Sequence, residues 1–221
     1  LFWIKNDYLI MHDALHVDAD IPSHWHLQVV GDEHTGDLKN GWIFKGRFGT
    51  DLQVLMPGLD DAEVSVKQTP ILDTRPEDEC FSMRHLQVSG TLGTDNYLGV
   101  LRPLAAGRKP VNAEPIRHQG QVVGATILGD RIEDIILSSR DRIAWQGHGV
   151  RFDGRYGAVL VRPDRLTLAL LDGRAISYKD LCITSDGPMI ELAIQGNDLS
   201  VVTRGSGRFT LTRGNQTQHF N

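Results

Sequence analysis

The side chains best suited to chemistry are a carboxylate and two imidazoles near the start of the chain: Asp13, His24 and His26. The segment around the histidines, Ile21–Val30, alternates between apolar and polar residues, and side chains of a strand alternate between its two faces. The alternation predicts two imidazoles, two residues apart, on one polar face. Zinc is often bound by imidazole and carboxylate groups, so convergence of the three side chains would form a metal site. The alternative is a partly exposed polar face, with Asp13 hydrogen-bonded to neighbouring backbone.

Two apolar segments must position these side chains. They are Tyr8–Leu15 and Ile21–Val30, and a short acidic turn joins them. We therefore expect two strands, with Asp13 one strand away from the histidines.

A second group of candidates is a locally basic stretch around a proline-rich loop. Its members are Arg102, Arg108, Lys109, Arg117 and His118. Such a stretch could contact an acidic glycan or an acidic neighbouring domain. The alternative is a solvated loop.

The composition is that of an ordinary globular protein, with 221 residues, 40% of them hydrophobic, and a formal net charge of −5. The negative charge argues against nucleic acid as a partner. No apolar run approaches the roughly 20 residues that span a bilayer.

The two cysteines, Cys80 and Cys182, are too few for a disulfide framework and form either one bridge or two free thiols. Because the chain begins at Leu1 without a signal-peptide pattern, we expect it to be a piece of a longer protein.

The rest of the chain reads as short strands separated by turn residues, without helical periodicity. Asp-Gly, Gly-Asp and Gly-Asn pairs separate apolar runs, and such pairs are strong hairpin signals. They occur at residues 129–130, 153–154, 172–173, 186–187 and 196–197. The pattern predicts an all-β fold with little helix, an antiparallel β-sandwich or stacked sheets. We expect a first β-region over residues 1–102, a loop over 103–115 and a second, hairpin-rich region over 116–221, packed together as one unit.

Several segments, in this order, resemble the C-terminal β-region of the heparinase II/III-like polysaccharide lyases, a group that includes related alginate and ulvan lyases. The resembling segments are LFWIKNDYLIMHDAL, HWHLQ, DNYLGVLRPLAAGRKP, RIEDIILSS and LTLALLDGRAISYKDLCITSDGPMIELAIQGNDLSVVTRG. The resemblance implies antiparallel sheets that pack against an N-terminal α/α-toroid, which is not part of this sequence. It also implies cleavage of uronate-containing polysaccharides by β-elimination, in the periplasm or outside the cell.

The resemblance bears on site residues as well. Some members of the family bind a structural zinc through two histidines and an aspartate, which Asp13 and His26 match. β-Elimination needs a base, a group that neutralises the uronate carboxylate and an acid. The family's catalytic tyrosine and much of its cleft lie in the toroid, so the catalytic residues are unknown and this segment alone is not expected to be catalytic. The alternative function is a stand-alone carbohydrate-binding or structural β-sandwich module.

Overall fold

The computed structural model describes residues 1–4, 7–15, 22–31, 33–46, 49–70, 82–90 and 96–220. All regular structure in these residues is strand, arranged in three antiparallel sheets, and this confirms the all-β, sandwich-like fold class. The strands are β1 Phe2–Ile4, β2 Tyr8–Ala14, β3 His24–Val30, β4 His34–Asp37, β5 Gly41–Phe44, β6 Asp51–Leu55, β7 Glu63–Pro70, β8 Ser82–Ser89, β9 Asn96–Leu104, β10 Asn112–His118, β11 Gln121–Gly129, β12 Ile132–Gly147, β13 Val150–Val161, β14 Arg165–Tyr178, β15 Leu181–Ser185, β16 Met189–Gln195, β17 Asp198–Arg204, β18 Phe209–Arg213 and β19 Gln216–Phe220.

The chain divides into two compact units, Leu1–Ala113 and Glu114–Asn221. The loop predicted over 103–115 is shorter in the structure, because β9 continues through Leu104 and β10 begins at Asn112. Proline cannot donate a ladder hydrogen bond and is therefore tolerated only beside a free strand edge. Pro103 lies beyond the last β2–β9 pair, and Pro115 lies in β10, an edge strand.

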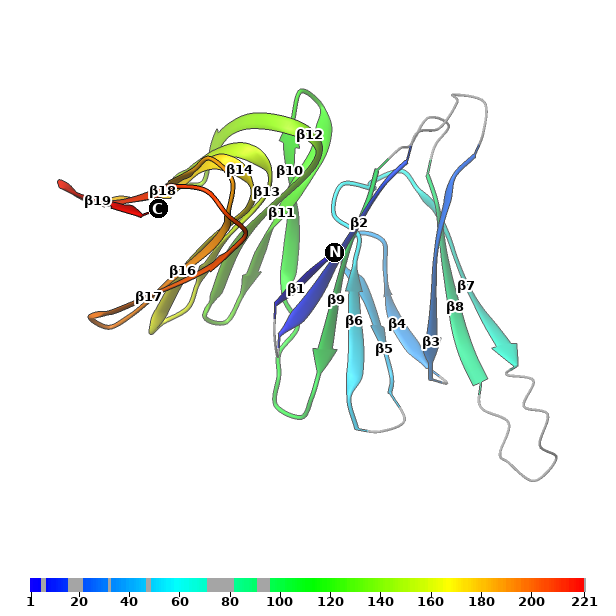
Figure 1. Cartoon of the computed structure of the whole chain (residues 1–221). Helices are drawn as coiled ribbons and strands as arrows, with labels where there is room; N and C mark the ends of the chain where they lie inside the picture. The colour runs from blue at the N-terminus through cyan, green and yellow to red at the C-terminus, as the bar shows by residue number, and fades with distance from the viewer. Residues whose placement is uncertain are drawn as a thin grey trace. The chain divides into compact units, whose positions relative to one another are not determined.

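The first unit is a sandwich of two sheets, with strand orders β1-β2-β9-β6-β5-β4 and β3-β8-β7 (Figure 1). Strands β2 and β3 follow each other in the chain but belong to different sheets, so the expectation that Asp13 lies one strand away from the histidines is wrong. Each segment has enough apolar surface to cover one side of a shared core. Two strands show the same alternation of apolar and polar residues whether they pair in one sheet or pack face to face in two sheets. Ile21, the predicted start of the second strand, lies outside the described residues.

The core of this unit fills the space between the two sheets. Its buried residues are Trp25, Val29, Trp42, Phe44, Val54, Met56, Leu86, Val88 and Tyr97. Tyr97 also links the two sheets through its hydroxyl group. The hydroxyl donates a hydrogen bond to the Ser23 carbonyl over 2.7 Å and shares another of 2.7 Å with Ser23 Oγ. It also accepts a hydrogen bond from the Gly90 amide over 3.0 Å. Ser23 precedes β3 and Gly90 follows β8, so one hydroxyl holds both strands at the same end.

The second unit is a single curled sheet built on the long strands β12, β13 and β14 (Figure 1). Strand β14 pairs with β16 through its first half and with β15 through its second half, so the sheet divides there into two branches. One branch continues through β18 to β19, and the other ends at β17. Apolar residues from β10 to β18 form the core of this unit.

Two of the predicted hairpin turns are wrong, because Asp153-Gly154 lies inside β13 and Asp172-Gly173 inside β14. These glycines face each other across the sheet, where the register shifts. A Cβ on Gly154 would lie 2.6 Å from the Asp172 carbonyl oxygen, so close approach of the backbones explains the glycines better than a turn does. The three other pairs do separate consecutive strands.

An ion pair in the second unit joins Asp134 of β12 to Arg162, which directly follows β13. The carboxylate of Asp134, which is fully buried, accepts from both Nη atoms of Arg162, over 2.7 Å for Nη2, and from the Val161 amide over 3.1 Å. In neither unit do the described residues form a helix that could cross a membrane.

Candidate functional site

Asp13 points into the interior of the first unit. Its Oδ2 accepts a hydrogen bond of 3.0 Å from Nε1 of Trp25, whose side chain is 5% exposed. The contact joins β2 in one sheet to β3 in the other, so Asp13 acts as a polar partner for a core tryptophan. Because Trp25 is flanked by His24 and His26, the two imidazoles must point to the opposite side of β3.

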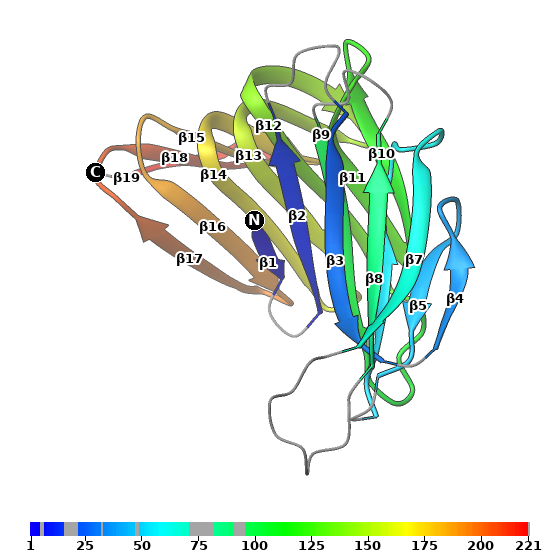
Figure 2. The same ribbon diagram turned by 90° about the vertical axis from the view of Figure 1, so that its right-hand side faces the viewer.

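The outer side of the β3-β8-β7 sheet carries those imidazoles, as the alternation predicted. His24 and His26 are exposed, whereas Trp25 and Val29 are buried. Strand β8 lies between β3 and β7, and directly paired residues share a face (Figure 2). The surface, which we call the histidine face, therefore comprises His24, His26 and Gln28 of β3, Ser89, Gln87 and His85 of β8, and Glu63, Ser65 and Lys67 of β7.

Hydrogen bonds between β3 and β8 organise the histidine face. Nδ1 of His26 and Nε2 of His85 are 2.9 Å apart, so one ring donates and the other accepts. Nδ1 of His24 lies 2.8 Å from Oγ of Ser89 and 3.5 Å from the amide nitrogen of Gln87. The arrangement places imidazole, amide and hydroxyl groups in a row, ready to bind a polar ligand across the strands.

His85 is the member of the histidine face that the sequence analysis did not single out. The signal was present, because His85, Gln87 and Ser89 alternate with Leu86 and Val88, both fully buried. The same period-two pattern that identified the face of β3 therefore also identifies the face of β8.

The three predicted zinc ligands do not fit one shared ion. Asp13 lies on the inner side of the sandwich with Trp25, while His24 and His26 lie on the histidine face. Within the described ranges, no three side chains of histidine, cysteine, aspartate or glutamate are grouped so as to hold a metal.

The predicted basic stretch is divided between the two units. Arg102 is 6% exposed and its Nη2 lies 3.4 Å from Oδ1 of Asp7, so it is a buried ion-pair partner rather than part of an exposed basic surface. Arg108 lies 3.5 Å from the same oxygen, and Lys109 beside it is exposed.

Arg117 and His118 belong to the second unit, where Nη1 of Arg117 donates to the Gly120 carbonyl over 3.3 Å. Cys182, on β15, is a free, half-buried thiol, and Cys80 lies outside the described residues.

Three of the four tyrosines are buried, with exposures of 1% for Tyr8, 1% for Tyr97 and 7% for Tyr178. Tyr156 is half-buried, and its hydroxyl group lies 3.4 Å from Nη2 of Arg155. A phenol that serves as base or acid must reach the substrate, so the buried tyrosines are poorly placed for β-elimination. The arrangement of the described residues is better suited to binding a polar ligand than to proton transfer from tyrosine.

No family model matches the sequence of this chain, and no curated protein matches it.

Proposed function

We propose that this chain is the C-terminal β-sandwich portion of a polysaccharide lyase that acts on uronate-containing glycans by β-elimination. In this proposal it packs against an α/α-toroid domain of the same protein, which carries most of the catalytic cleft. The order of the resembling segments supports the lyase assignment, and the antiparallel sheets agree with it in architecture.

The histidine face is the observation that supports a glycan as the binding partner. A uronate-containing glycan presents carboxylate and hydroxyl groups along an extended chain. The face presents imidazole rings of His24, His26 and His85 beside amide and hydroxyl groups, all of which form hydrogen bonds to such a ligand. Its fixed charges are Glu63 and Lys67 on β7, which have opposite signs.

Affinity electrophoresis of the chain in gels containing polyuronate tests this proposal. Replacing His24, His26 and His85 with alanine should remove most of the retardation, because it removes the imidazole hydrogen-bonding groups. The matched control is His148→Ala, which changes an exposed imidazole of the second unit and should leave retardation unchanged. Equal retardation of the triple variant and the wild-type chain would contradict the assignment of this face.

A further inference from the structure

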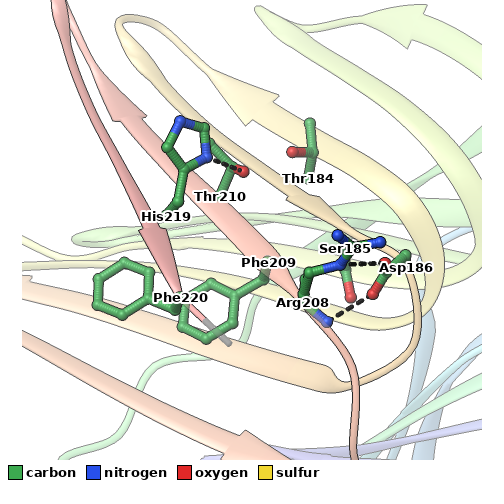
Figure 3. A pocket seen from close by; sticks show the side chains of 8 residues that line it. All are labelled: Thr184, Ser185, Asp186, Arg208, Phe209, Thr210, His219 and Phe220. Carbon is green, nitrogen blue, oxygen red and sulfur yellow. Dashed lines mark hydrogen bonds and ion pairs between the residues drawn. The ribbon is translucent and has the colours of Figure 1, made fainter.

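A pocket of about 450 Å³ lies in the second unit, where β15 ends and the β18–β19 hairpin runs beside it (Figure 3). We call it the hairpin pocket. It is lined by Thr184, Ser185, Asp186, Arg208, Phe209, Thr210, His219 and Phe220. The volume falls within the range of about 300–1,000 Å³ that is typical of small-molecule sites.

One side of the hairpin pocket is a fixed charge pair. Oδ1 of Asp186 accepts from the Arg208 amide over 2.5 Å, and Oδ2 accepts from its Nε over 3.3 Å. The Asp186 amide in turn donates to the Arg208 carbonyl over 3.0 Å. These bonds hold the guanidinium from its Nε side and direct the Nη1–Nη2 edge away from Asp186. The Arg208 side chain is 77% exposed, so this edge is open to a second carboxylate, which a guanidinium binds with two parallel hydrogen bonds.

The other side of the hairpin pocket is aromatic. The rings of Phe209 and Phe220 are stacked, with centroids 4.5 Å apart and planes within 5°. In Figure 3 the two rings lie at the left and the Asp186–Arg208 pair at the right. A ligand that spans the pocket therefore meets an aromatic surface on one side and the Asp186–Arg208 pair on the other.

Hydroxyl and imidazole groups complete the lining. Oγ1 of Thr210 lies 2.9 Å from Nδ1 of His219, which orients the imidazole and leaves its Nε2 for another partner. Thr184 pairs with Thr210 on the neighbouring strand and adds a second hydroxyl group. Such groups exchange hydrogen bonds with sugar hydroxyls in either direction.

We propose that the hairpin pocket binds one carboxylate-bearing sugar residue of a glycan chain. Its carboxylate pairs with the Nη1–Nη2 edge of Arg208, the C–H surface of its ring lies against Phe209 and Phe220, and its hydroxyls bond to His219 and Thr184. The choice of an acidic sugar rests on the proposed function. The charge pair, the stacked rings and the hydroxyl groups together support a sugar as the ligand. A small carboxylate without a ring would not contact the aromatic side of the pocket.

The test is an NMR titration of the ¹⁵N-labelled chain with an oligoglucuronate, and with a neutral oligoglucose of the same length. We expect the acidic ligand to shift the amide signals of β18, β19 and Asp186, and Arg208→Gln to weaken its binding about tenfold or more. The matched control is Arg213→Gln, an exposed arginine at the far end of β18, which should bind as the wild-type chain does. The backbone bonds between Asp186 and residue 208 do not need the guanidinium, so the variant should keep the wild-type spectrum outside the pocket.

Equal affinity of Arg208→Gln and the wild-type chain would overturn the proposal, and so would equal binding of the neutral ligand. If the acidic ligand shifts only the signals of the histidine face, the hairpin pocket is excluded while glycan binding by the chain stands. If no acidic ligand shifts any signal, both proposals fail.

Discussion

The hydrogen bond between Asp13 and Trp25 gives Asp13 a structural role in place of the predicted role as a zinc ligand. Trp25 is 5% exposed and its indole donates to Asp13 over 3.0 Å. Asp13→Ala would leave this donor in the core without an acceptor, and a hydrogen bond to a charged group contributes about 1.5–3 kcal/mol. We therefore expect Asp13→Ala to lower the free energy of unfolding by about 2 kcal/mol. Asp13→Asn, which keeps a carbonyl acceptor, should cost less.

A double-mutant cycle with Trp25→Phe isolates this contact, because the phenyl ring lacks the donor and the packing lost with the smaller ring cancels between the two arms of the cycle. We expect a coupling energy of about 1–2 kcal/mol between the two substitutions. Urea unfolding followed by fluorescence measures it, since Trp42, 2% exposed in the same core, remains as the reporter. Each variant is measured with zinc and with EDTA. A coupling energy near zero, or a zinc-dependent stabilisation that is lost in Asp13→Ala, would refute the account of Asp13.

Four further predictions concern single groups. Tyr97→Phe removes three hydrogen bonds without leaving a large cavity and should cost about 1–3 kcal/mol in urea unfolding; an unchanged midpoint would contradict it. Arg162→Met removes the cation that pairs with a fully buried carboxylate and should cost about 3–5 kcal/mol by the same method, and a loss below that of Tyr97→Phe would be evidence against the pair. The hydrogen bond from Lys45 holds the pKa of Asp51 below its usual range, so this group stabilises the fold above the unfolded pKa and loses that effect as the pH falls through the folded pKa. Wild type and Asp51→Asn should therefore converge in stability at low pH, and a constant difference would argue otherwise. Burial raises the pKa of the Cys182 thiol, so peptide mapping after iodoacetamide treatment at neutral pH should show slower labelling in the native chain than in urea, whereas equal rates would contradict the burial.

Residue alternation predicted the faces of individual strands well. His24 and His26 lie on an exposed side of β3 and Trp25 on the buried side, because a two-residue period leaves only two faces to choose between. The same rule, applied to β8, would have placed His85 on the side of that strand opposite Leu86 and Val88. Local pattern was thus sufficient wherever the question concerned one strand.

Local pattern failed wherever the answer depended on a distant segment. Strand β2 pairs with β9 and strand β3 pairs with β8, and both partners come later in the chain. These distant partners place β2 and β3 in different sheets. Gly154 and Gly173 resembled turn residues because a close backbone contact favours glycine as strongly as a turn does. Arg102 resembled a surface residue because Asp7, its ion-pair partner, lies about a hundred residues away along the chain. The hairpin pocket had no sequence signal, since the register of three strands brings its lining together.

The measurement that tests the central claim most directly is an ultraviolet assay for unsaturated uronate. It would be run on a panel of acidic polysaccharides with this chain alone and with the longest natural protein that contains it. The account predicts product from the long protein and none from the chain alone, because it assigns the catalytic tyrosine and most of the cleft to the toroid. Product from the chain alone would contradict the accessory role, and absence of product from both across the panel would contradict the lyase assignment.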